Sequence, residues 1–315
     1  MANRQEKRVL VYIRIKRIIK SFLGQNIGSF YLFGIINRLM VSFLKSNFAE
    51  VQGQKMFLDK KDVLGLSING VYEPLETKLV RKEVKKGDVV LDIGANIGYY
   101  TLIFAKLVGK KGRVFAFEPD PTNFALLKKN ISINGYKNVI LVPKAVAGKT
   151  ERRKLYLIKD NPGGHRLYDS PQSDRFLEVE AISLDDYFRG NNLRIDFIKM
   201  DIEGAEKEAI RGMINLLKRN RKAKIVTEFN PLGLKNFGNK PSEYLKLLEK
   251  LGFKFWKINE QEKKIESIEI PELLKTYTPE KRNYTNLLCS REEFVVKRRI
   301  LLKKNVSLLG NLVCL

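Results

Sequence analysis

The chain has 315 residues, 44% hydrophobic and 30% charged, so it can bury a sizeable core and is neither disordered nor fibrous. Its 59 basic and 35 acidic residues give a formal net charge of +24. That charge indicates a polyanionic neighbour such as nucleic acid, an anionic membrane surface or an anionic glycan. Because basic residues are spread along the whole chain, a lysine-rich composition without a specific partner is an equally weighted interpretation.

The two cysteines, Cys289 and Cys314, are too few and too far apart for a disulfide framework or a zinc knuckle. The single histidine, His165, excludes a mechanism that needs two imidazoles. No compact apolar stretch followed by a small-residue cleavage site is evident near the N-terminus. We therefore expect a reducing, cytoplasmic compartment.

The first fifty residues differ from the rest of the chain. Their apolar residues recur every three or four positions among basic ones, which predicts a basic amphipathic helix. Such a helix is typical of a membrane-surface element, here at the inner membrane face, or of a cap docked on its own domain. Residues 27–44 approach the length of a membrane span, but Asn37 and Arg38 lie inside that stretch and are costly in hydrocarbon. A packed helical cap is favoured over interfacial attachment, and attachment over a true span.

After residue 86, apolar strands alternate with helices, which predicts a parallel sheet covered on both faces. The expected elements in chain order are strands 88–94 and 113–119, a helix to 133, strands 139–145 and 195–201, a helix over 205–217, and strand 223–229. A helix over 242–251 and closing strands at 253–258 and 285–290 follow. The long insertion at about 148–194 falls at the carboxyl ends of the strands, where α/β sheets bind ligands, so we expect it to form part of the site.

The strongest motif is VLDIGANIGYYT, in which a strand ends at Asp92 and a glycine turn opens a helix. Gly94, Asn96 and Gly98 let the backbone turn tightly, and the helix N-terminus offers unpaired N–H groups. The pattern is neither the dinucleotide fingerprint nor a phosphate loop. It favours a ligand that carries a carboxylate and an ammonium group.

Glu118 ends the next strand, where an acid can accept hydrogen bonds from both ribose hydroxyls. A nucleoside joined to an amino-acid tail describes S-adenosylmethionine. A third motif, IKMDIEGAE, places Asp201 at the end of the fourth strand and Glu203 and Glu206 at the start of a helix. For those two glutamates, stabilisation of the helix N-terminus is an even alternative to a role in the site.

These motifs together resemble the FkbM family of S-adenosylmethionine-dependent methyltransferases. The similarity covers about residues 87–228 and rests on the two motifs above, on FAFEPDPTNFALLKKNISING, on AVAG and on SLDDYF. It implies an α/β class I methyltransferase fold with a mostly parallel seven-stranded sheet and helices on both faces, plus the N-terminal basic helical extension. The expected domains are 1–50, the methyltransferase domain 51–290 and a basic, apolar tail 291–315.

The resemblance implies O-methyl transfer to a hydroxyl of a sugar, a glycolipid or a related natural product. We expect Asp92, Gly94, Asn96, Gly98, Tyr99, Glu118 and Ala145 to bind the donor, although Tyr99 fits packing under the turn almost equally well. Asp201 is the expected base, or a ligand of a divalent ion that acidifies the hydroxyl. Glu203 would assist, and His165, in the NPGGHRL loop, is the second candidate base. Too few oxygen ligands are visible to predict a metal site.

An RNA methyltransferase is the alternative function, because the net charge of +24 suits phosphate neutralisation. The residues disfavour it, since no Asn/Asp-Pro-Pro-aromatic motif ends the fourth strand and no RNA-binding module is appended. A non-catalytic scaffold with the same fold is disfavoured by the intact set of Asp92, Glu118 and Asp201.

Overall fold

The computed structural model describes residues 47–159 and 161–294. The expected N-terminal helix, the 27–44 stretch and all but the first residues of the C-terminal tail lie outside this range. The chain divides into two compact units between Tyr72 and Glu73. The described part of the first unit is an antiparallel hairpin, β1 (Phe48–Val51) and β2 (Gln54–Phe57), followed by the short helix α3 (Leu66–Asn69). The domain boundaries expected at residues 50 and 290 stay predictions.

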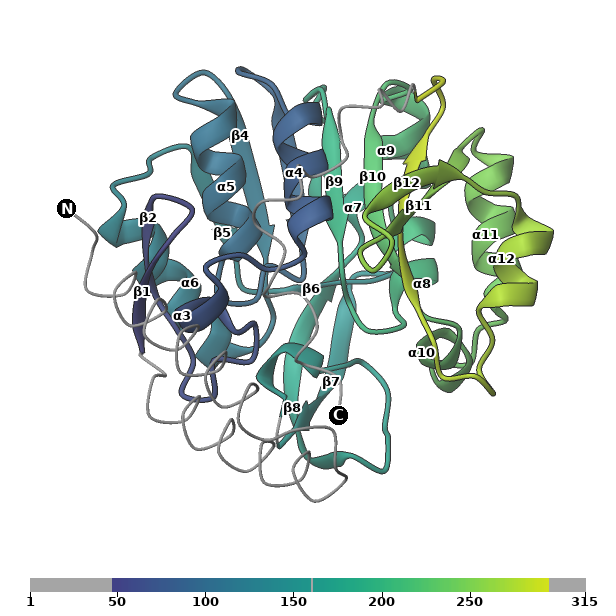
Figure 1. The fold of residues 1–315 in the computed structure, drawn as a ribbon, viewed down its shortest axis with the longest axis horizontal. Helices are drawn as coiled ribbons and strands as arrows, with labels where there is room; N and C mark the ends of the chain where they lie inside the picture. Colours follow the sequence, from purple (N-terminus) through teal and green to yellow (C-terminus); the bar gives the residue numbers. More distant parts are fainter. Residues whose placement is uncertain (1–46, 160, 295–315) are drawn as a thin grey trace, which may run out of the picture. The chain divides into compact units, whose positions relative to one another are not determined.

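The second unit contains an eight-stranded sheet with the order β12-β11-β13-β10-β9-β3-β4-β5 (Figure 1). The strands from β10 to the edge strand β5 run parallel to one another, whereas β13 runs antiparallel to both β10 and β11. The mostly parallel sheet is therefore confirmed, with one strand more than the seven expected, because β12 pairs with β11 as an edge hairpin. The strands are β3 (Val89–Ile93), β4 (Arg113–Phe117), β5 (Val139–Val142), β9 (Phe197–Met200), β10 (Lys224–Phe229), β11 (Lys254–Asn259), β12 (Lys264–Ser267) and β13 (Thr285–Ser290).

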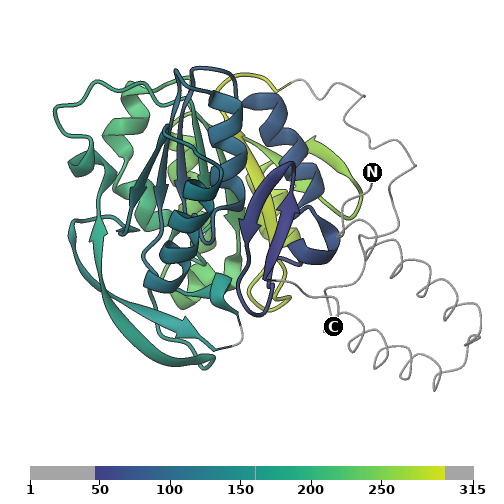
Figure 2. The ribbon, with the colours of Figure 1, turned by 90° about the vertical axis from the view of Figure 1, so that its left-hand side faces the viewer.

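Helices lie on both sides of this sheet (Figure 2). On one face, Thr101 of α5 donates a hydrogen bond to Asp92 of β3, and α4 packs beside α5. The opposite face forms a continuous apolar core in which strand residues such as Leu91 and Met200 join Leu216 and Leu245 of the covering helices. The helices are α4 (Pro74–Glu83), α5 (Tyr99–Val108), α6 (Pro121–Ile133), α7 (Leu184–Tyr187), α8 (Glu206–Arg211), α9 (Ile214–Arg219), α10 (Pro231–Asn236), α11 (Pro241–Lys250) and α12 (Ile270–Thr276).

The expected third strand, 139–145, was wrong as a single element. It breaks at Pro143, which cannot donate to a strand ladder. Its first part is β5 of the main sheet, and its last residue opens β6 (Ala145–Val146), which belongs to a separate sheet of order β6-β8-β7. The expected helix over 205–217 was also wrong as one element. It splits into α8 and α9 around Gly212, where an added Cβ would lie 2.1 Å from the carbonyl oxygen of Ala147.

The insertion forms a long antiparallel ribbon of β7 (Glu151–Ile158) and β8 (Ser173–Ile182) that leaves the main sheet (Figures 1 and 2). Its inner face has a small apolar core of its own that includes Leu155 and Val179. The connection between the two strands contains the 3-10 turn η1 (Pro162–Gly164). We call residues 161–168 the strap.

Candidate functional site

The glycine turn joins β3 to α5 through backbone angles that residues with side chains rarely adopt. Gly94, Asn96 and Gly98 all have positive φ angles, of 81°, 49° and 97°. A Cβ on Gly94 would lie 2.0 Å from the backbone carbonyl oxygen of Asp201, and one on Gly98 would lie 2.7 Å from Leu127 Cδ1. The turn therefore packs directly on the end of β9, and its glycines are required by space as well as by backbone angle.

Glu118 lies against this turn. One carboxylate oxygen accepts a hydrogen bond from the backbone N–H of Asn96 at 2.8 Å, and the other accepts one from Asp120 N–H at 2.9 Å. Burial raises the pKa of Glu118 to about 7, and the two backbone hydrogen bonds offset only part of that shift. Each oxygen keeps a lone pair for a further donor.

Asp92 and Tyr99 lie beneath the turn. The Asp92 carboxylate is 2% exposed and accepts a hydrogen bond from the Thr101 hydroxyl, and burial raises its pKa to about 6. The Tyr99 hydroxyl lies 3.0 Å from Thr77 Oγ1, and the side chain is buried. Tyr99 thus occupies the packing position that the sequence offered as its alternative. Ala145 is buried in β6, paired with Ala181 of β8.

A second group of acids lies where β9 and β10 end. Asp201 follows β9, its backbone N–H donates to Ile93 O, and its side chain is 34% exposed. Glu203 has a positive φ of 55°, and burial and the nearby Asp201 raise its pKa to about 7. Glu206 opens α8 and accepts hydrogen bonds from the N–H groups of Ile202 and Gly204, so it stabilises the turn.

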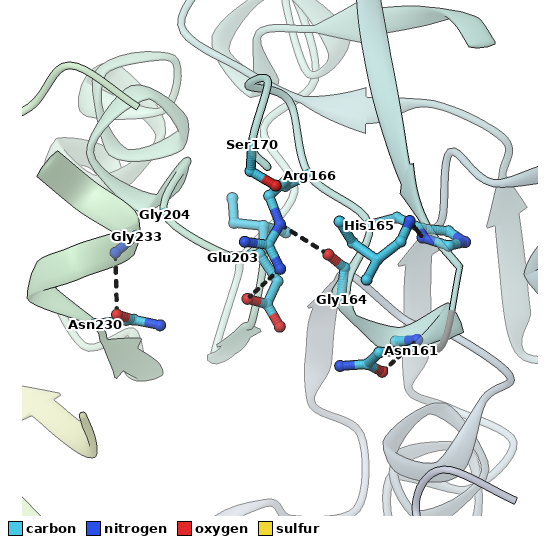
Figure 3. A network of polar contacts seen from close by, with 12 residues as sticks. Asn161, Gly164, His165, Arg166, Ser170, Glu203, Gly204, Asn230 and Gly233 are labelled. Carbon is cyan, nitrogen blue, oxygen red and sulfur yellow. Dashed lines mark hydrogen bonds and ion pairs between the residues drawn. The ribbon is translucent and has the colours of Figure 1, made fainter. Parts of the chain in front are cut away.

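The strap lies between the glycine turn and the second group of acids, and Figure 3 shows its Arg166 directed toward Glu203. At one end, Asn123 of α6 donates from Nδ2 to Pro162 O at 2.9 Å, and a Cβ on Gly163 would lie 3.0 Å from Asn96. At the other end, the Arg166 guanidinium lies 3.9 Å from the Glu203 carboxylate while it donates to Gly164 O. The strap therefore runs from the glycine turn to the end of β9, and its part in the site stays a prediction.

His165 is held on the turn side of the strap. Its Nδ1 accepts from Ile158 N–H at 3.0 Å, and its Nε2 lies 3.9 Å from the carboxylate of Asp120, which caps α6. Burial lowers the pKa of His165 despite the nearby Asp120. Asp120 is thus the acid that pairs with His165. The role of His165 as a second candidate base stays a prediction.

Several further polar side chains lie in this region. Lys199 of β9 is 2% exposed and lies 3.2 Å from the Glu76 carboxylate of α4 and 3.6 Å from that of Asp201. Glu73 accepts hydrogen bonds from Tyr100 and Asn286. Glu228, at the end of β10, is 8% exposed and has a buried oxygen without a hydrogen-bond partner among the described residues. Glu73, Glu76 and Asn286 stand in no motif, so only the fold reveals them.

Two kinds of feature are absent from the described residues. In residues 47–159 and 161–294, no helix is long and apolar enough to cross a membrane. Over the same two ranges, no group of three or more His, Cys, Asp or Glu side chains is arranged to hold a metal ion.

Known proteins resemble this chain in the same region. The family model for the methyltransferase FkbM domain matches residues 92–255, more than half of the chain. The hexuronic acid methyltransferase AglP of Haloferax volcanii is 28% identical over 145 residues, which cover 44% of this chain and 56% of AglP. The 31-O-demethyl-FK506 methyltransferase FkbM of Streptomyces tacrolimicus is 26% identical over 160 residues, which cover 42% of this chain and 61% of that protein.

A solved rRNA methylase from Streptococcus thermophilus aligns over 70% of this chain and 95% of its own, with 12% identity and a TM-score of 0.41. That similarity is too low to indicate a substrate. The chain spans little more than half the length of the two curated relatives, so their acceptors are not transferred to it. The family match and the strand order together establish that the chain belongs to the FkbM family of methyltransferases, class I α/β enzymes whose methyl donor is S-adenosylmethionine.

Proposed function

We propose that this enzyme transfers the methyl group to a hydroxyl of a sugar, a glycolipid or a related natural product, with Asp201 as the base. The observation that carries the proposal is the position of Asp201. Its carboxylate is partly exposed at the end of β9, and its backbone contacts Gly94 of the glycine turn. The names of two relatives, a hexuronic acid methyltransferase and a methyltransferase of a 31-O-demethyl compound, support an oxygen acceptor of this class.

The turn and Glu118 fit the donor. A Cβ at Gly94 or Gly98 would meet atoms that pack against the turn, so glycine at both positions lets the backbone turn tightly and approach a ligand closely. The free lone pairs of Glu118 suit the two ribose hydroxyls. We assign Asp92, Gly94, Asn96, Gly98 and Glu118 to the donor. Ala145 would lie beside the adenine, and the packed Tyr99 would support the turn from below.

Asp201 would take the proton from the acceptor hydroxyl as the new C–O bond forms. When bound, S-adenosylmethionine supplies a methyl group on a cationic sulfur. The sulfur is the leaving group and keeps the electron pair of the broken C–S bond. The chain must hold the acceptor oxygen in line with that bond, and correct positioning supplies much of the rate. Glu203, which forms an ion pair with Arg166 of the strap, would orient the acceptor beside Asp201.

We also propose that the basic N-terminal segment attaches the enzyme to an anionic membrane face where glycolipids are assembled. The support is the amphipathic spacing of its basic and apolar residues. Removal of Met1–Lys20 should then move the enzyme from the membrane fraction to the supernatant without loss of donor binding. Failure of the truncated chain to fold would favour a packed cap instead.

The acceptor class is tested with methyl-labelled S-adenosylmethionine and the separated lipid, glycan and RNA fractions of the host. Wild type, Asp201→Asn and the control Asp186→Asn, which changes an acid of α7, are compared. We expect label in the glycan or glycolipid fraction with wild type and the control, and its loss with Asp201→Asn. Label in RNA would replace the proposed acceptor class with the alternative that the net charge suggested.

Each variant's affinity for S-adenosylhomocysteine is measured by calorimetry in parallel. Unchanged affinity in Asp201→Asn, together with lost transfer, assigns Asp201 to the acceptor step. Full transfer by Asp201→Asn would refute its role as the base.

A further inference from the structure

A buried lysine–glutamate pair lies directly behind Asp201. Lys199 Nζ lies 3.2 Å from Glu76 Oε1, and the two side chains are 2% and 0% exposed. The same ammonium lies 3.6 Å from Asp201 Oδ2, whose side chain is 34% exposed. The cation therefore has one carboxylate behind it in the core and one in front of it at the site.

Stability does not explain this pair. Removing each ion from water costs several kcal/mol, and replacing a buried pair with apolar side chains of similar volume is often neutral or stabilising. The pair is also incompletely satisfied, since among the described residues neither Glu76 oxygen receives a hydrogen bond. A buried ion pair whose carboxylate lacks hydrogen bonds is typical of a functional role.

The surroundings fix the ammonium in place. It lies 5.2 Å from the centre of the Tyr100 ring, and the Tyr100 hydroxyl donates to Glu73, which also accepts from Asn286 at 2.7 Å. Burial by itself would lower the pKa of Lys199, but the carboxylates of Glu76, Asp201 and Glu73 outweigh burial and raise it. Lys199 thus stays protonated, and at 2% exposure it does not reach the acceptor.

Asp201 needs such a cation because the other groups around it are acids. Five acids interact electrostatically with it: Asp92 of β3, Glu73 just before α4, Glu203 just before α8, Glu206 of α8 and Glu228 of β10. Burial raises the pKa of each of these five acids, and every one of them that is ionised disfavours ionisation of a further carboxyl group nearby. Among these described neighbours, Lys199 supplies the positive charge, while Arg166 lies at Glu203.

We infer that Lys199, anchored by Glu76, is a positioning residue that keeps the Asp201 carboxylate charged and directed toward the acceptor hydroxyl. The inference rests on the proposed role of Asp201 as the base. Lys199 takes no proton itself. The proton of the acceptor hydroxyl passes to Asp201.

The test compares Lys199→Met, which leaves Glu76 unpaired, with the double variant Glu76→Gln/Lys199→Met, which removes both charges. The matched control, Lys257→Met/Glu266→Gln, removes a 2.8 Å pair that joins β11 to β12. Melting temperature, affinity for S-adenosylhomocysteine and the pH profile of label transfer to the host glycan fraction are measured for each. The carboxyl carbons of aspartate are followed by 13C NMR, with Asp201→Asn used to assign the Asp201 signal.

We expect the double variant to recover the melting temperature that Lys199→Met loses, because no buried charge stays unpaired. It should nevertheless transfer label about 100-fold more slowly, the usual effect of a misplaced catalytic group. The acid limb of its profile and the protonation of the Asp201 signal should both move to higher pH. The control should match wild type in every measurement except melting temperature.

A double variant that regains wild-type transfer together with its stability, and shows an unmoved acid limb and Asp201 signal, would overturn the inference. The NMR arm separates this failure from failure of the proposed function. If Asp201→Asn transfers label normally, Asp201 is not the base, whereas the Asp201 signal still reports whether Lys199 controls its charge.

Discussion

The two halves of the proposed site, one for the donor and one for the acceptor, are built in different ways. The donor half, formed by the glycine turn and Glu118, consists mainly of backbone, and its parts follow one another closely in the chain. The acceptor half, around Asp201, consists of side chains drawn from α4, β9, β10 and the strap. A shared donor suits the first arrangement, and an acceptor that varies among relatives suits the second.

The largest expected effect isolates the acceptor half. Asp201→Asn keeps the shape of the side chain but removes its capacity to take a proton. We expect methyl transfer to fall by about 10² to 10⁴-fold, the usual contribution of a general base, with donor affinity unchanged. Initial-rate kinetics and calorimetry on the same samples check both parts. A matching loss of donor affinity would show that the two halves are not separable.

The same contrast explains which parts the sequence predicted. Strand ends, the glycine turn and Glu118 followed from local spacing, because a short stretch of chain determines each of them. The Glu76–Lys199 pair did not follow, because it depends on how α4 packs against β9. The breaks at Pro143 and Gly212 were missed for related reasons. Apolar periodicity continued across Pro143, and the close approach of Ala147 to Gly212 is a tertiary contact.

Gly94→Ala should damage both halves at once. Its Cβ would lie 2.0 Å from the Asp201 carbonyl oxygen, and its φ of 81° is strained for any side chain. We expect a loss of stability of about 3 kcal/mol, in the range of strain plus overpacking, and donor affinity reduced about 100-fold. The control is Gly135→Ala, whose φ is 70° but whose Cβ would meet nothing within 4 Å. It should cost only about 1 kcal/mol. Equal losses in denaturant melts would mean that the close contact is unimportant.

Donor affinity should depend on pH through Glu118. Burial raises its pKa from 4.5 to about 7, so its contribution to stability is complete below pH 4.5 and is lost as the pH rises through about 7. Ribose hydroxyls donate to the charged carboxylate, so donor binding has the opposite trend. Affinity for S-adenosylhomocysteine should rise about tenfold from pH 6 to pH 8, as the charged fraction rises.

In Glu118→Gln this rise should disappear from calorimetric titrations. If it persists there, the titrating group lies elsewhere. Asp92, whose pKa burial raises to about 6, would then be the next acid to test.

The smallest effects should come from the strap, which touches both halves. Asn123→Ala removes the hydrogen bond to Pro162 O at the turn end, and Arg166→Met removes the ion pair with Glu203 at the other end. One hydrogen bond contributes about 1 kcal/mol, or about fivefold in affinity. Asn123→Ala should therefore weaken donor binding about fivefold with little change in the acceptor KM, and Arg166→Met should do the reverse. If each variant changed both constants equally, the strap would act as one rigid piece. The strap would then belong to both halves of the site and could not be divided between them.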